Sequence, residues 1–153
     1  MVSRRTMIKA AVATALIPAA FAARASEPLV VVWKSPTCGC CTDWVSHMQA
    51  NGFKVTVNEV PSTAPVRAKM GIPERFGSCH TAAVDGYALE GHVPAKEVRR
   101  LLKERPQAAG LAVPGMPVGS PGMDGPEYKG RKDPYDVLLV GRDGGTRSYQ
   151  SYL

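Results

Sequence analysis

The chain has 153 residues, of which 44% are hydrophobic and 21% are charged. This length suggests a single domain, and the composition excludes an intrinsically disordered chain and a coiled coil. The formal net charge of +6 would favour nucleic acid or an anionic membrane as a partner. Whether such a partner is needed depends on where the basic residues lie along the chain.

The first 25 residues are predicted to be an export signal. They combine a basic start at Arg4 and Arg5, an apolar stretch over residues 10–23 and a small-residue cleavage site at 23–25. The apolar stretch is shorter than the roughly 20 residues that span a bilayer. Residues 3–9 resemble the twin-arginine signal, which exports folded proteins. An ordinary secretory signal and a retained membrane anchor are the alternatives.

Cleavage of this signal leaves residues 26–153 as one exported domain, which we expect in the periplasm. The signal holds four of the 19 basic residues and none of the 13 acidic residues, so the mature net charge is +2. No basic run with interleaved aromatic residues remains, and we therefore expect no nucleic-acid partner. We also expect no membrane span after cleavage.

The mature chain is predicted to alternate strands and helices. In chain order the pattern predicts a strand at 29–33, a helix at 42–50, a strand at 53–60, a helix at 64–70, strands at 81–84 and 87–90, and a helix at 95–105. This order is that of a thioredoxin-like α/β domain, with a mixed sheet flanked by helices. Residues 107–134 are rich in proline, glycine and methionine and are expected to form a long loop without regular structure. Strands at 135–140 and 146–152 are predicted to form a C-terminal hairpin.

The sequence Cys38-Gly39-Cys40-Cys41 lies between a predicted strand and a predicted helix. A helix N-terminus favours the thiolate form of a cysteine. Cys38 and Cys41 have the Cys-X-X-Cys spacing of a redox pair, in which Cys38 would be the catalytic nucleophile and Cys41 the resolving thiol. Thiolate is also the form that binds metal, so the spacing alone leaves both chemistries open.

Three features favour metal. Thiol–disulfide exchange needs two sulfurs, whereas Cys40 supplies a third. Cys79 and His80 directly precede a predicted strand, at the place where thioredoxin-like oxidoreductases carry a cis-proline. Thiolates together with an imidazole suit Cu(I) and Zn(II). A structural disulfide or a structural zinc site is the less specific alternative.

Four segments of the mature chain resemble the CopG-type family. They are residues 33–41 (WKSPTCGCC), 78–82 (SCHTA), 91–94 (GHVP) and 113–123 (VPGMPVGSPGM). Members of that family are exported bacterial proteins with a thioredoxin-like fold, often encoded among copper-resistance genes. The resemblance extends over residues 28–152 and implies a role in the redox handling of copper. It implies copper ligation by five residues: Cys38, Cys40, Cys41, Cys79 and His80.

We therefore expect a periplasmic copper-binding protein of copper resistance that is redox-active between Cu(I) and Cu(II). Because thiolates can bridge Cu(I) ions, the ligand set could hold more than one copper. A copper donor or an electron-transfer protein is the expected partner. Two alternatives stay open: a thiol–disulfide oxidoreductase that uses Cys38 and Cys41, and a copper chaperone without redox change.

Four further residues are left outside the predicted ligand set. Met116 and Met123 have soft thioethers in the long loop, which could fold over the site, but both could equally anchor the loop to the core. His47 is predicted to be a surface histidine. His92 precedes a helix start, where a capping or turn role explains it equally well.

Overall fold

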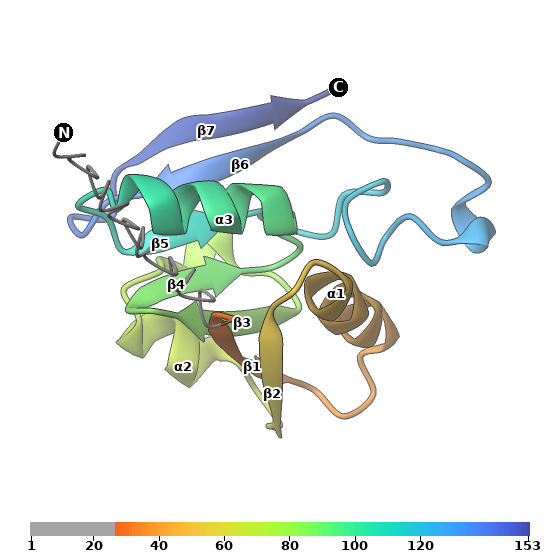
Figure 1. Ribbon diagram of the computed structural model, residues 1–153, viewed down its shortest axis with the longest axis horizontal. Coiled ribbons are helices and arrows are strands. Elements are labelled where there is room, and N and C mark those ends of the chain that lie inside the picture. The colour runs from red at the N-terminus through yellow and green to blue at the C-terminus, as the bar shows by residue number, and fades with distance from the viewer. Residues whose placement is uncertain (1–26) are drawn as a thin grey trace, which may run out of the picture.

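The computed structural model describes residues 27–153; the predicted signal and its cleavage site lie outside the described residues. The elements in chain order are β1 (Leu29–Lys34), α1 (Gly39–Ala50), β2 (Lys54–Glu59), α2 (Ala64–Lys69), the 3-10 turn η1 (Glu74–Phe76), β3 (His80–Val84), β4 (Tyr87–Glu90), α3 (Ala95–Glu104), β5 (Gly110–Ala112), the 3-10 turn η2 (Pro126–Tyr128), β6 (Tyr135–Val140) and β7 (Thr146–Tyr152). The described residues thus form a mixed α/β structure, as predicted (Figure 1).

All seven strands belong to one sheet in the order β2-β1-β3-β4-β5-β6-β7. The pairs β1–β2 and β4–β5 are parallel, and every other neighbouring pair is antiparallel. The predicted hairpin of β6 and β7 is confirmed and extends the sheet on the side away from β2.

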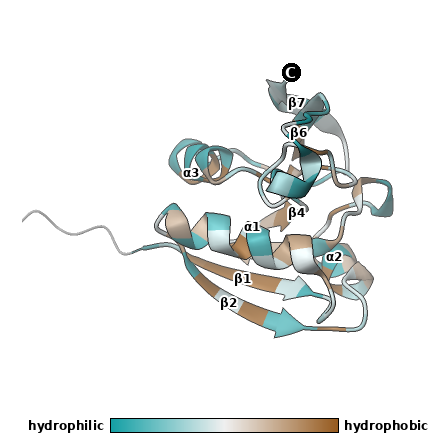
Figure 2. Ribbon diagram, turned by 90° about the vertical axis from the view of Figure 1, so that its right-hand side faces the viewer, coloured by the Kyte–Doolittle hydropathy of each residue, from teal (hydrophilic) through white to brown (hydrophobic). Residues whose placement is uncertain are grey.

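The two faces of the sheet are covered differently. The main core joins one face to α1 and α3, through side chains such as Val32, Trp44, Leu89 and Leu101. A smaller apolar cluster around Ile72 covers the other face, together with the chain that follows α2. Figure 2 shows β1 as apolar along most of its length; residues 30, 32 and 34 are buried, whereas residues 31 and 33 are half-buried.

Two predictions about the elements were wrong in detail. α1 begins at Gly39 and not at residue 42, so two of the cysteines lie in its first turn. The stretch 107–134 contains the short strand β5, which pairs with both β4 and β6. β5 packs so closely against β4 that a Cβ on Gly110 would overlap the carbonyl oxygen of Ala88. Such a strand is fixed by its neighbours and carries little local signal.

The chain between β5 and β6 is the long loop that the sequence predicts. It is held by its own turns, for example by the Asp133 amide, which donates to the Val118 carbonyl at 2.8 Å, and by the Gly119 amide, which donates to the Met123 carbonyl at 2.7 Å. Figure 1 shows it extending beyond the sheet on the side of α1.

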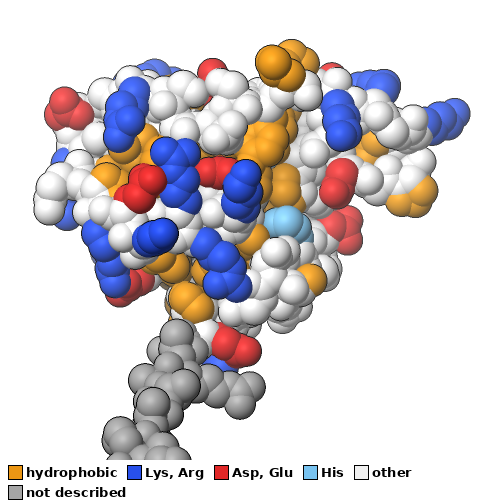
Figure 3. Space-filling model, turned by 45° about the horizontal axis from the view of Figure 1, so that its top comes forward, with side chains coloured by type: hydrophobic (Ala, Val, Ile, Leu, Met, Phe, Trp, Pro, Cys, Tyr) orange, Lys and Arg blue, Asp and Glu red, His pale blue; other side chains and the backbone are white. Residues whose placement is uncertain are grey.

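The outer side of α3 carries exposed Lys and Arg side chains, and acidic side chains lie among them (Figure 3). Arg100 is paired with Glu104 at 2.8 Å, and Arg105 with Asp85 at 2.5 Å. Exposed pairs of this kind contribute little to stability. Within residues 27–153, no helix has the length and apolar character needed to cross a membrane.

Candidate metal centre

The first turn of α1 positions three cysteines. Cys38 is the N-cap residue, Cys40 lies in the first turn, and Cys41 is fully buried. Cys38 and Cys41 are joined by a disulfide with a Cα–Cα distance of 5.4 Å. Cys38 makes no side-chain cap bond, so it leaves the first amide groups of α1 uncapped, and the positive end of the helix dipole favours negative charge on sulfurs at this N-terminus.

Cys79 reaches the same place from the loop before β3. Its carbonyl oxygen lies 3.7 Å from the Cys41 sulfur, and the Cys40 sulfur lies 3.6 Å from that of Cys38. The sulfurs of all four cysteines lie within 4.8 Å of one another. Cys40 and Cys79 are free thiols. Segments 38 residues apart in the sequence thus bring four soft donors into one group.

Two histidines form a second group with Cys79. The ring centroid of His80 lies 4.4 Å from that of Trp44 and 5.2 Å from that of His92. The Cys79 sulfur is 3.4 Å from His80 Nδ1 and 3.0 Å from His92 Nε2. His80 and His92 are both fully buried, and His80 Nε2 has no hydrogen-bond partner among the described residues. An unpartnered buried ring nitrogen is costly unless it has a ligand.

The tautomer of His92 follows from its other contact. Nδ1 lies 2.8 Å from the carbonyl oxygen of Pro121, which can only accept a hydrogen bond. The proton of the neutral ring is therefore on Nδ1, and the lone pair on Nε2 faces Cys79. Metal-binding histidines are commonly oriented by a bond of this kind from their second nitrogen.

Burial determines the protonation of this group. It raises the pKa of the Cys79 thiol to about 12, with the nearby Cys40 thiol adding to the effect. Burial also lowers the pKa of His80 to about 3, and it lowers the pKa of His92. At neutral pH the group therefore consists of a thiol and two neutral imidazoles. A bound cation would replace the thiol proton, as is usual for thiolate ligands.

Comparison with known proteins gives a consistent result. A family model described as "Protein of unknown function, DUF411" matches residues 76–123. A solved structure of copper resistance protein CopG, form 2, is 42% identical, with a TM-score of 0.77, and covers 83% of this chain and 99% of its own. The form 1 structure is 44% identical, with a TM-score of 0.75, and covers 82% and 98%. The chain belongs to the CopG family. No curated protein matches it.

In this CopG-family chain, the residues predicted as metal ligands come together in two groups. One group holds Cys38, Cys40, Cys41 and Cys79, and the other holds Cys79 together with two histidines. Cys79 is common to both. The predicted ligand His80 lies in the second group, 3.4 Å from Cys79 and on the side of the sheet that faces α1.

His92 is the residue that sequence reasoning left out. The pairs Thr81–Glu90 and Ala82–Leu89 of the β3–β4 hairpin fix a register that, continued by two residues, places His92 opposite Cys79. Gly91, with a φ of +71°, lets the backbone before His92 pack closely against Ser78. A Cβ on Gly91 would lie 2.6 Å from the Ser78 hydroxyl. Because the hairpin was predicted from the sequence, its register was a signal that could have identified His92.

The other residues left outside the ligand set have separate roles. His47 is half-buried, and its Nε2 accepts the Ala95 amide at 3.1 Å, which satisfies a free N–H group at the start of α3. Met123 is buried, and its sulfur accepts the Tyr128 hydroxyl at 3.4 Å. Met116 is 50% exposed.

The long loop packs against the metal centre. Pro121 orients His92, and Gly115 accepts a hydrogen bond from the Ser78 hydroxyl. Gly122 lies so close to the first turn of α1 that a Cβ there would be 2.6 Å from the Cys40 carbonyl oxygen. The loop thus contacts both cysteine-bearing segments.

The donor chemistry of this CopG-family chain fits copper. Once the Cys38–Cys41 disulfide is reduced, the four cysteine sulfurs and two imidazoles are the soft and borderline ligands that Cu(I) prefers. Described carboxylates, the ligands of harder ions, are absent from both groups. His80 Nε2 is a further buried nitrogen, and it has no hydrogen-bond partner in the described part of the chain.

Replacing His92 with alanine is expected to weaken Cu(I) binding by about 10- to 100-fold, because it removes a donor that is oriented toward Cys79. Competition with a colorimetric Cu(I) chelator measures the change. His47→Ala is the matched control, since His47 belongs to neither group, and we expect its affinity to stay within about twofold of the wild type. Equal affinity of the wild type and His92→Ala would exclude His92 as a ligand.

Proposed function

We propose that this chain is a periplasmic copper-binding protein that acts in copper resistance and is redox-active. The proposal is supported by the names of the solved relatives, which are copper resistance proteins, and by the chemistry of the two donor groups. The observation that carries it is the position of Cys79, the sulfur common to the four-cysteine group and the group with two histidines.

The domain that supports this site is proposed to be thioredoxin-like from β1 to α3, with β5–β7 added to it. The β-α-β-α-β-β-α order and the sheet order β2-β1-β3-β4 are consistent with that fold. The described residues contain no cis peptide bond, and Cys79 and His80 stand where a thioredoxin-like oxidoreductase has its cis-proline. Two donors in that place favour a metal site over a site for disulfide substrates.

More than one copper ion is expected. Cys79 belongs to both donor groups. A thiolate sulfur can bridge two Cu(I) ions, so Cys79 could serve a copper ion in each group. Six donor residues are also more than the two to four that one Cu(I) ion takes, since cuprous ion prefers low-coordinate soft sites.

The redox role uses Cys38 and Cys41. When their two thiolates form the disulfide, two electrons are released, and these reduce two Cu(II) ions to Cu(I). The reverse reaction returns two electrons to the disulfide and regenerates the thiolates. The Cα–Cα distance of 5.4 Å between these residues permits the bond without backbone movement.

The predicted signal supports a periplasmic location for this chemistry, with the twin-arginine route as the expected path of export. An oxidising compartment is also where the Cys38–Cys41 disulfide would persist. A copper donor or an electron-transfer protein remains the expected partner.

An anaerobic Cu(I) titration of the reduced protein tests the proposal. We expect binding of more than one copper per chain, with an ultraviolet thiolate-to-copper charge-transfer band that grows until the site is filled. Metal analysis after gel filtration gives the stoichiometry. The proposal fails if a weak Cu(I) chelator removes all copper from the protein.

The alternative is a thiol–disulfide oxidoreductase, which is favoured by the disulfide at the N-terminus of α1 and by the partial exposure of Cys38. Such an enzyme would reduce insulin through Cys38 without copper. A copper chaperone, the remaining alternative, would transfer Cu(I) to an acceptor without any change in the thiol count.

A further inference from the structure

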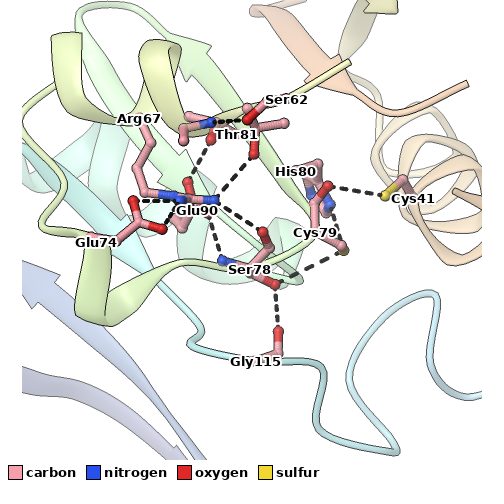
Figure 4. A network of polar contacts seen from close by, with 12 residues as sticks. Cys41, Ser62, Arg67, Glu74, Ser78, Cys79, His80, Thr81, Glu90 and Gly115 are labelled. Atoms are coloured by element: carbon pink, nitrogen blue, oxygen red, sulfur yellow. Dashed lines mark hydrogen bonds and ion pairs between the residues drawn. The ribbon is translucent and has the colours of Figure 1, made fainter. Parts of the chain in front are cut away.

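A buried ion pair makes hydrogen bonds to the backbone of the segment that carries Cys79 (Figure 4). Arg67 of α2 and Glu90 of β4 are both almost completely buried, and Arg67 Nε donates to Glu90 Oε1 at 2.8 Å. Neither residue belongs to the metal-binding groups. The metal centre lies on the face of the sheet that is covered by α1, and the ion pair lies on the other face.

The ion pair binds both peptide groups that lead to Cys79. Glu90 Oε1 accepts the Ser78 amide at 2.7 Å, which fixes the peptide group between residues 77 and 78. Arg67 Nη2 donates to the Ser78 carbonyl at 3.1 Å, which fixes the next peptide group, shared by Ser78 and Cys79. The position of the Cys79 backbone therefore depends on two groups of opposite charge that contact each other.

Strand β3 links the ion pair on one face of the sheet to the metal centre on the other face. Thr81 donates to Glu90 Oε2 at 2.6 Å, so this carboxylate receives three donors in all. The preceding residue, His80, points to the opposite face, as alternation along a strand requires, and contacts Trp44 there. The same carboxylate thus fixes the strand beside the histidine and the loop beside the cysteine.

The chain is shaped to admit this pair. A Cβ on Gly77 would lie 2.9 Å from Arg67 Cζ, so a larger residue there would require the guanidinium to move away from the loop. The remaining donors of Arg67 are also used: Nη1 donates to Glu74 at 2.8 and 2.9 Å, and Nη2 to Thr63 at 3.1 Å. A guanidinium with all its donors occupied has a fixed orientation.

We propose that Arg67 and Glu90 are positioning residues of the copper site, which hold the Cys79 sulfur in place between the two donor groups. A buried ion pair is weak support for stability as such, because removing two charges from water offsets most of their attraction. Its value here is geometric, since its hydrogen bonds fix the two peptide groups that lead to Cys79. This inference rests on the proposed function.

Two substitutions separate the roles of charge and geometry. Arg67→Lys keeps the charge but cannot contact both Glu90 and the Ser78 carbonyl in the same way, and Glu90→Gln keeps the shape but removes the charge. Each is expected to weaken Cu(I) binding by about 10-fold to 100-fold, as loss of supporting contacts does at other metal sites, and to shift the thiolate-to-copper charge-transfer band. Both quantities are measured well below each variant's unfolding temperature, where a purely structural residue would leave the band unchanged.

Glu74→Gln is the matched control. The Glu74 side chain bonds to the same guanidinium but is 77% exposed, and its hydrogen bonds go to Arg67 and not to residues 78–80. We expect it to bind Cu(I) within about twofold of the wild type. If Arg67→Lys and Glu90→Gln do not fold, Gly77→Ala tests the same contact, because its methyl group displaces the guanidinium while every charge is kept.

The outcomes are distinct. If the wild type binds no Cu(I), the proposed function fails. If the wild type binds Cu(I), and the folded variants at Arg67, Glu90 or Gly77 bind it with the same affinity and the same band, the positioning role is excluded while the proposed function stands.

Discussion

Cys79→Ser is expected to lower the affinity for Cu(I) by on the order of 100-fold or more. The substitution keeps the size of the side chain but removes the sulfur that both donor groups share. Loss of supporting contacts alone costs about 10- to 100-fold at metal sites, so loss of a shared ligand should exceed that range. We also expect fewer copper ions per chain. Chelator competition and metal analysis measure both effects.

The same variant discriminates between a copper-binding protein and a thiol–disulfide oxidoreductase. The oxidoreductase needs only Cys38 and Cys41, so its insulin reduction would survive Cys79→Ser almost unchanged. If Cys79→Ser retained both insulin reduction and wild-type copper affinity, Cys79 would not be a copper ligand, and the result would support the oxidoreductase. Strongly weakened copper binding is the result we expect, and this loss separates the two functions, because the intact Cys38–Cys41 pair could support thiol–disulfide exchange under either one.

Acidification is expected to destabilise the metal-free protein, in part through His80. Its pKa is lowered to about 3 in the folded state by burial, from 6.5 for an exposed histidine. Between these values the unfolded chain binds the proton and the folded chain does not, so stability falls as the pH falls below 6.5. From pH 7 to pH 5, His80 alone accounts for a loss of about 2 kcal/mol in the free energy of unfolding.

Urea denaturation of the wild type and His80→Phe at both pH values checks this prediction. Phenylalanine fills a similar volume beside Trp44 and does not titrate in this range. The difference in stability between pH 7 and pH 5 should therefore be smaller in the variant by about 2 kcal/mol. Burial also raises the pKa of Glu90, which acts in the opposite direction, but Glu90 is present in both proteins and cancels in the comparison. Equal pH dependence would show that His80 is accessible to protons in the folded state.

The elements up to α3 could be predicted because each has a local cause. β1 is a continuous run of β-branched residues, the β3–β4 turn is Asp85-Gly86, and α3 buries Val98 and Leu101 on one side. β5 could not be predicted in this way, because the sequence at 110–112 has no strand pattern of its own. It becomes a strand only when β4 and β6 provide hydrogen-bond partners on both sides.

Some residues of the candidate site could likewise be predicted from the sequence, whereas the roles of others depend on the tertiary structure. The four cysteines and His80 were predicted as ligands from residue type and spacing and from the family resemblance, since a set of soft donors in an exported chain favours either a soft metal or a disulfide. The contribution of His92 and the support from Arg67 and Glu90 depend on strand pairing and on which face each side chain occupies. A buried arginine on a short helix gives no sign in the sequence of the carboxylate that it will meet.

The long loop joins β5 to β6, which are antiparallel neighbours in the sheet. In topological terms residues 113–134 are therefore an enlarged hairpin connection, and every donor of the two metal-binding groups precedes them in the sequence. The entropy of closing such a connection changes only slowly with its length. We therefore expect that the length of this loop can change without altering the strand order or the positions of the residues in the two groups.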